Sequence, residues 1–117
     1  MSLHLELKER LEQAYAARLP EGVALHQDAL LMNFDTGLAL EARFASAEEY
    51  TINWLWGDAR LRIDTAPLHP ELATCPNHFH DVDEQVRPDP LTRPGASPWE
   101  NLGKVIDALL VDPLLQS

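Results

Sequence analysis

The amino-acid sequence predicts an α+β protein, with helices packed on one face of an antiparallel sheet. Three observations carry this prediction: an amphipathic pattern near the N-terminus, alternating apolar and polar residues through the middle, and a capped helix pattern near the C-terminus. A run of strands flanked by helices is typical of this class, because each helix buries its apolar stripe against the sheet. The 117 residues fit a single domain spanning 1–117.

The first predicted element is a helix from about Leu3 to Leu19. Apolar side chains recur there at helical spacing and form one face, which consists of Leu7, Leu11, Ala14, Tyr15 and Leu19. Pro20 and Gly22 then end the helix. We expect this helix to cover the sheet.

The middle of the chain predicts an antiparallel meander of about four to five strands. Stretches rich in apolar, β-branched and aromatic residues are separated by Gly-containing turns. The expected strands are 29–34, 38–44, 50–56 and 60–65, with a fifth around 23–26. Trp54 and Trp56 lie on one face of the expected strand 50–56, where they belong either to the core or to an interface.

Strand periodicity assigns the side chains of the last of these strands to two faces. Leu61 and Ile63 point inward. Arg60, Arg62 and Asp64 point outward. The polar side chains that lead into the next segment are therefore expected on one surface.

The last predicted element is a helix that begins after Ser97. Ser97, Pro98 and Glu100 form a capping box with proline at the first helical position. The buried stripe is expected to contain Trp99, Leu102, Val105, Ile106, Leu109 and Leu110. The acidic, Pro-rich segment before it, 81–95, is expected to be an extended, solvated connector.

Composition limits the classes of function. The chain carries 9 basic and 19 acidic residues, a formal charge of −10, which disfavours nucleic acid and anionic membranes as partners. RNA therefore requires a local basic or histidine patch. A single cysteine forms no internal disulfide, and no apolar run has membrane-spanning length. We expect a cytoplasmic protein.

The segment 64–81, read as DTAPLHPELATCPNHFHD, is the place where chemistry is expected. It holds three of the five histidines (His69, His78 and His80) and the only cysteine, Cys75. Imidazoles titrate near neutral pH, bind metals and transfer protons. In an extended segment His78 and His80 point to the same side and can converge on one ligand.

Three interpretations of this cluster remain open. Zinc accepts histidine, cysteine and carboxylate ligands, but the spacing matches no standard finger. In the second interpretation His69, His78 and His80 act as general acids and bases without a metal, and Asp64 orients an imidazole. Arg60 or Arg62 then holds a phosphate. These six residues are the candidate site, for which we expect no metal and no cofactor. In the third interpretation the histidines only bond backbone carbonyls of the loop.

The same segment resembles the signature of the TumE family of small proposed toxins of prokaryotic toxin–antitoxin pairs. The matching residues are Asp64, Pro67, His69, Pro70, Glu71, Leu72, Pro76, His78 and His80. The resemblance implies a helix-turn-helix antitoxin-like partner and a ribonuclease-like activity, which we expect to be independent of metal.

The alternative function is a non-enzymatic interaction module. Its acidic connector or exposed sheet face would bind a basic protein partner, since the net charge is −10. An exposed edge strand is also compatible with a homodimer.

Overall fold

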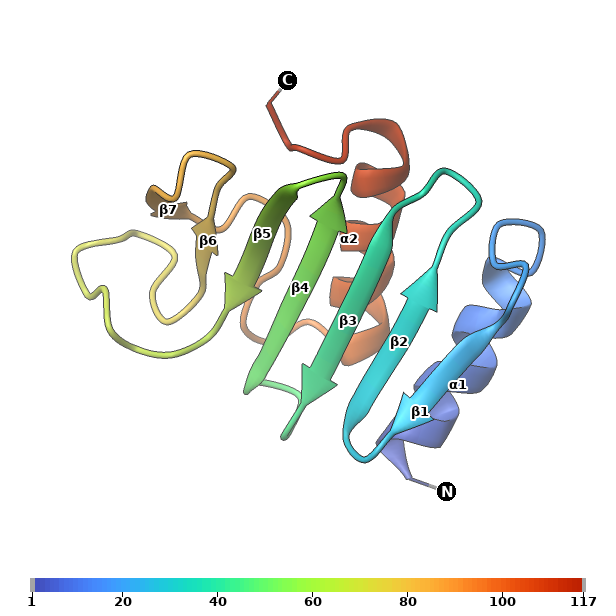
Figure 1. Ribbon diagram of the computed structural model, residues 1–117. Helices are drawn as coiled ribbons and strands as arrows, with labels where there is room; N and C mark the ends of the chain where they lie inside the picture. Colours follow the sequence, from blue (N-terminus) through green and yellow to red (C-terminus); the bar gives the residue numbers. More distant parts are fainter. Residues whose placement is uncertain (1, 117) are drawn as a thin grey trace.

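The computed structural model describes residues 2–116 and contains two helices and seven strands. The elements are α1 (Leu3–Ala14), β1 (Val23–His26), β2 (Ala29–Asn33), β3 (Ala39–Phe44), β4 (Tyr50–Trp56), β5 (Ala59–Asp64), β6 (His78–His80), β7 (Val86–Pro88) and α2 (Pro98–Val111). The strands form one antiparallel meander in chain order. Both helices lie on one face of this sheet, α1 behind β1 and β2 and α2 behind the central strands (Figure 1).

The predicted α+β class is confirmed, but the prediction of four to five strands is wrong. The structure adds two short strands, one in the expected histidine loop and one in the expected connector. His78–His80 pairs with β5, and Val86–Pro88 pairs with His78–His80 in turn. Pro88 is tolerated because it stands at the end of an edge strand, where its missing N–H breaks no ladder.

The core lies between the helices and the inner face of the sheet. Every strand from β2 to β6 contributes buried apolar side chains at alternate positions, as the period of two predicts. Trp54 is buried and its ring stacks on Phe79 at a centroid distance of 5.9 Å. Its indole N–H also donates to the Pro113 carbonyl at 2.8 Å, which fixes the chain just after α2. Trp54 is therefore a core residue.

Helix α1 is shorter than predicted, ending at Ala14 rather than Leu19. The following residues form tight turns, in which the backbone N–H groups of Arg18 and Leu19 both donate to the Tyr15 carbonyl. Leu19 is still buried, so the apolar periodicity correctly predicted burial but not helix length. Neither helix of residues 2–116 has the length and apolarity that crossing a membrane requires.

Helix α2 begins at the predicted cap. Ser97 is the N-cap and its hydroxyl accepts from the Glu100 N–H at 3.1 Å, with Pro98 in the first turn. Five of its side chains are buried against the sheet or the preceding segment, namely Asn101, Leu102, Val105, Ile106 and Leu109.

The outer face of the sheet is not covered by either helix (Figure 1). Its side chains form rows across the strands because the register places them opposite one another. One row runs Leu31, Glu41, Asn53, Arg62 and His80. A second runs Ala29, Arg43, Thr51, Asp64 and His78. A third runs Asn33, Ala39, Leu55 and Arg60.

A buried polar network ties the histidine segment to the sheet and to α2. The Tyr50 hydroxyl donates to the Thr92 hydroxyl at 2.8 Å and accepts from the Asn77 amide at 2.9 Å. The Asn101 amide also reaches Tyr50, at 3.3 Å. Asn77 immediately precedes His78, so this network places the start of β6.

Removing the hydroxyl at the centre of this network should destabilise the fold. We expect Tyr50→Phe to lower the free energy of unfolding by about 1–3 kcal/mol, because buried partners lose their hydrogen bonds. Tyr15→Phe is the matched control: its hydroxyl is only partly buried and bonds Asp107 at 2.7 Å. Urea unfolding measures both, and an equal or smaller loss for Tyr50→Phe would contradict this role of the network.

Candidate functional site

The pairing of β5 with β6 builds the candidate site. The register places Arg62 opposite His80 and Asp64 opposite His78, so the four side chains share the outer face. Sequence reasoning predicted that His78 and His80 lie on one side, and the structure confirms it: their ring centroids are 4.9 Å apart. Phe79, between them, is buried in the core.

Asp64 lies at the centre of the cluster. Its Oδ1 accepts from the Ala66 N–H at 2.7 Å, which turns the chain out of β5. Its Oδ2 lies 3.5 Å from Arg62 Nε and 4.0 Å from His78 Nε2. These distances exceed those of ordinary hydrogen bonds, so the attraction between the Asp64 carboxylate and the Arg62 guanidinium is electrostatic. Arg62 Nε itself is buried without a hydrogen-bond partner.

His78 is the buried member of the histidine set. It is only 2% exposed, and its Nδ1 lies 3.2 Å from the Pro76 carbonyl oxygen. Because a carbonyl can only accept, Nδ1 carries the proton and Nε2 faces Asp64. The ring centroids of His69 and His78 are 4.9 Å apart. The fold therefore brings the three histidines together.

His80 is the histidine that pairs with an arginine. Its Nε2 lies 3.3 Å from Arg62 Nη2, and a guanidinium can only donate, so Nε2 accepts. Burial, followed by the positive charge of Arg62, lowers the pKa of His80 below its usual value. The imidazole is therefore held in its neutral form, with a lone pair directed at a cation.

Arg60 and Arg62 face a shared hollow beside His80. This cavity has a volume of about 390 Å³ and is lined also by Asn53, Asp81 and Glu84. The Arg60 side chain is exposed and makes no ion pair or hydrogen bond within the described part of the chain. Both arginines that the sequence singled out thus lie at the cluster, and Arg60 is free to bind an anion.

Two other residues of the 64–81 segment do not join the His–Asp group. Cys75 is exposed and does not join the His–Asp group. Asp81 instead holds the β6–β7 turn, where it accepts from the Asp83 and Gln85 N–H groups and pairs with Arg87. Arg87 holds the pKa of the Asp81 carboxyl below its usual value, so this group is a structural anion.

Within residues 2–116, one group of side chains could hold a metal ion, and it belongs to the same cluster. Asp64, His78 and His80 each offer a ligand atom, and these atoms lie within 4.8 Å of one another. The Arg62 guanidinium, however, lies against both Asp64 and His80. It already supplies the positive charge that a metal would bring. The arrangement therefore favours a metal-free site.

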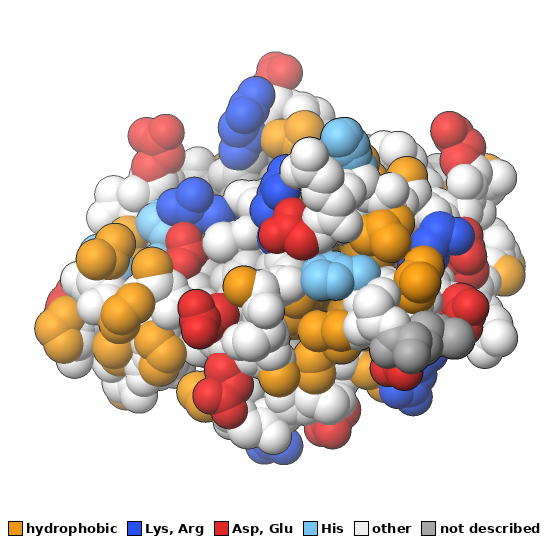
Figure 2. Space-filling view, turned by 90° about the horizontal axis from the view of Figure 1, so that it is seen from below, with side chains coloured by type: hydrophobic (Ala, Val, Ile, Leu, Met, Phe, Trp, Pro, Cys, Tyr) orange, Lys and Arg blue, Asp and Glu red, His pale blue; other side chains and the backbone are white. Residues whose placement is uncertain are grey.

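The 66–77 segment covers His78 and presents apolar side chains outward. Leu68 is 73% exposed, and Pro67 and Pro70 are exposed beside it. Figure 2 shows hydrophobic side chains gathered at the end of the molecule that this segment forms. Cationic, histidine and acidic side chains lie next to them.

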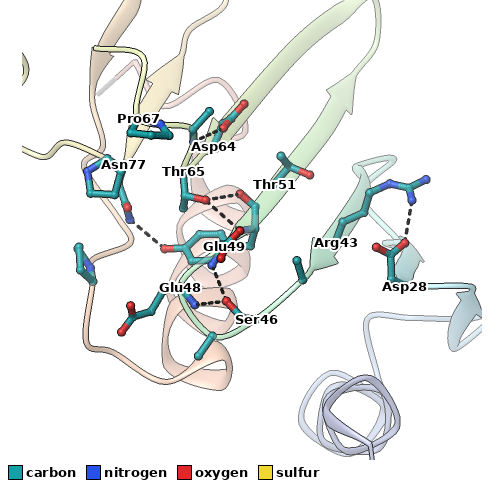
Figure 3. A pocket seen from close by; sticks show the side chains of 16 residues that line it. Asp28, Arg43, Ser46, Glu48, Glu49, Thr51, Asp64, Thr65, Pro67 and Asn77 are labelled. Atoms are coloured by element: carbon teal, nitrogen blue, oxygen red, sulfur yellow. Dashed lines mark hydrogen bonds and ion pairs between the residues drawn. The ribbon is translucent and has the colours of Figure 1, made fainter. Parts of the chain in front are cut away.

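A wider cavity of about 930 Å³ opens on the other side of Asp64 (Figure 3). It lies between the β3–β4 turn and the start of the 66–77 segment, and its rim carries the carboxylates of Asp28, Glu48 and Glu49. Arg43 is paired there with Asp28 at 2.9 Å. The unpaired negative charge of this rim disfavours phosphate. The hollow beside His80 also carries two carboxylates, but Asp81 is paired with Arg87 and two guanidinium groups face the hollow, so its balance of charge is more favourable to phosphate.

Sequence reasoning missed the buried polar residues that hold the site. The sequence predicts a solvated connector over 81–95, yet Asp89 and Thr92 within it are buried. The Asp89 carboxylate accepts from the Leu91 and Thr92 N–H groups at 2.8 and 2.9 Å. The signal was an aspartate followed by proline and, three residues on, threonine, which is typical of an Asx turn.

The fold and the site together define an α+β protein with an open-faced antiparallel sheet and a His–Asp–Arg cluster at one end. Comparisons with models of known protein families, with curated proteins and with solved structures find no match. The function must therefore be inferred from the geometry of the cluster.

The lowered pKa of His80 has a consequence for stability. Below the unfolded-state pKa of about 6.5, the unfolded chain binds a proton at His80 more readily than the folded chain does. His80 therefore makes the folded state less stable as the pH falls through that value. The charged and titratable groups that face the His80 imidazole and act on its pKa are those of Arg62, His78, Asp64 and His69.

We expect the stability of the wild type relative to His80→Asn to fall between pH 7.5 and pH 5.5. Urea unfolding of both proteins at the two pH values measures the difference. A stability difference that does not change with pH would contradict a neutral His80 held beside Arg62.

Proposed function

We propose that this chain is a toxin-like, metal-independent ribonuclease whose reacting groups lie at the β5–β6 cluster. The observation that carries the proposal is the contact between Arg62 and the neutral imidazole of His80, at 3.3 Å. It places an anion-binding cation against a base with a lowered pKa, in an open hollow. Arginine and a base in contact are the two components that phosphodiester cleavage requires.

In the proposed step, a phosphate oxygen displaces His80 from the Arg62 guanidinium, which frees the Nε2 lone pair. His80 then takes the proton of the ribose 2′-hydroxyl, whose oxygen attacks the adjacent phosphorus. A bond forms between the 2′-oxygen and phosphorus as the bond to the 5′-oxygen breaks. A protonated His69 donates its proton to that leaving oxygen, so that protons balance.

The roles of the histidines differ from the sequence-based set because their exposures differ. His69 is partly exposed, with Nδ1 3.4 Å from Glu71 Oε1, so its ring is accessible from solvent. His78 is buried between the other two rings and is a positioning residue. Asp64 balances the charge of Arg62 and faces His78 Nε2.

The net charge of −10 opposes RNA binding at long range, so the proposal requires a local cationic site. Arg60 meets this requirement because it is exposed and unpaired among residues 2–116. A site with two arginines contacts only a few phosphates, which fits a short single-stranded substrate rather than a duplex.

We further propose a cytoplasmic helix-turn-helix antitoxin-like partner, on the basis of the motif in the 64–80 segment. The exposed apolar side chains around Leu68 lie beside the cluster and offer a contact surface for such a protein.

The alternative function is an acidic module that binds a basic protein without catalysis. It predicts that the complex with the basic protein survives the loss of His69 and His80.

Removing the proposed base or acid should abolish cleavage. We expect His80→Ala and His69→Ala each to lower the rate of RNA cleavage by about a hundredfold or more. His26→Ala is the matched control, because His26 lies on the same outer face, on β1, away from the cluster. Cleavage of single-stranded RNA by purified protein measures the effect, and wild-type activity in both cluster variants would overturn the proposal.

The activity should also survive removal of divalent metals. Because Arg62 supplies the positive charge at Asp64 and His80, we expect RNA cleavage at an unchanged rate in excess EDTA. The test uses protein purified without a histidine tag. Loss of cleavage that zinc or another divalent ion restores would show that the Asp64–His78–His80 group works as a metal site.

A further inference from the structure

A groove on the outer face of the sheet continues from the cluster across β4, β3 and β2. It has a volume of about 540 Å³, a size that accommodates a small ligand. Asn53 and Arg60 line both this groove and the hollow beside His80. A molecule bound at the cluster can therefore extend along the sheet face without leaving the surface.

Three polar side chains of this groove are unpaired, whereas the fourth, Glu41, forms an ion pair with Arg43 at 3.0 Å. The amides of Asn33 and Asn53 and the guanidinium of Arg60 make no hydrogen bond or ion pair with any residue between 2 and 116. Elsewhere on the same face Arg43 is paired with both Asp28 and Glu41. Donors and acceptors of Asn33, Asn53 and Arg60 thus remain available along the continuation of the cluster.

The floor of the groove is apolar. Leu31, Ala39 and Leu55 line it, and Leu55 is 41% exposed although it stands in the middle of the sheet. A ligand that fits here needs a flat apolar surface and an edge that both donates and accepts hydrogen bonds. A nucleobase has this combination, and the backbone of RNA carries the phosphate that Arg60 and Arg62 would bind.

The spacing also suits one nucleotide. Asn53 lies opposite Arg62 on the neighbouring strand, and Asn33 lies two strands beyond β4. Adjacent strands are about 5 Å apart, so the amides stand roughly 5–15 Å from the phosphate position. This range spans the distance from a phosphate to the base of its own nucleotide.

We propose that this groove binds the nucleobase next to the cleaved phosphodiester and that it prefers adenine; the inference rests on the proposed ribonuclease function. An asparagine amide can donate to the adenine N7 and accept from its N6 amino group in a bidentate pair. The Glu41 carboxylate lines the same groove; one oxygen is paired with Arg43, and the other can accept from an amino group, which uracil lacks. Asn53 is the principal specificity residue and Asn33 is the second.

The test measures binding of AMP, UMP and inorganic phosphate to the full chain by NMR or calorimetry. We expect AMP to bind about tenfold more tightly than UMP, because a bidentate amide pair discriminates by that order. Asn53→Leu should remove this preference, and Asn33→Leu, which lies outside the hollow beside His80, should weaken it and leave phosphate affinity unchanged. His26→Leu, an exposed position of the same face outside the groove, should retain it.

Asn53→Leu removes no hydrogen bond within residues 2–116, so the fold should survive, and Asn33→Leu provides a second variant with the same expectation. Equal or absent binding of AMP and UMP in the wild type would overturn the proposal. So would an adenine preference that both asparagine variants retain.

RNA cleavage separates this inference from the function on which it rests. An adenine preference in binding without any cleavage would support the base site and reject the ribonuclease. Cleavage that is equally fast in oligo(A) and oligo(U), with no preference in binding, would support the ribonuclease and reject the base site.

Discussion

The antiparallel pairing of β5 with β6 is the interaction on which the candidate site depends. It sets Asp64 opposite His78 and Arg62 opposite His80, so two short stretches far apart in the chain meet side chain to side chain. A shift by one residue would turn both histidines into the core and Phe79 to the surface. The stacking of Phe79 on Trp54 therefore fixes the register of the site from the opposite face of the sheet.

A three-residue strand supplies too few hydrogen bonds to hold this register alone, and the buried polar network completes it. Asn77 is anchored to Tyr50 and Thr92 immediately before β6. The Thr74 hydroxyl donates to the Asn77 carbonyl at 2.7 Å and accepts from the Asp89 N–H at 2.9 Å. Every member is hydrogen-bonded, which is the condition under which buried polar groups stabilise a single conformation. The buried side chains that hold the site therefore have hydrogen-bond partners, whereas polar side chains of the site that face solvent keep free donors and acceptors.

Sequence patterns predicted the features that depend on local chemistry. The alternation of residues 60–64 correctly assigned their faces, and Ser97 correctly marked the start of α2. The paired orientation of His78 and His80 followed from the same period of two.

The remaining features depend on contacts across long sequence separations. Strands β6 and β7 were missed because three residues carry too little periodicity to reveal a strand beside prolines. The partners of Asn77 lie 27 residues before it and 15 after it, a distance that no local pattern encodes. Asn53 had no signal in sequence, since its place in the groove follows from register with β3 and β5. The catalytic roles of the histidines and the toxin–antitoxin partner stay predictions.

The most direct test of the contact between Arg62 and His80 is an NMR titration of the His80 imidazole in the wild type and in Arg62→Gln. The glutamine keeps much of the side chain's volume but removes its positive charge. The account predicts that the pKa of His80 rises in the variant, because the cation that disfavours its protonated form is gone. An unchanged or lower pKa would contradict the contact between Arg62 and a neutral His80.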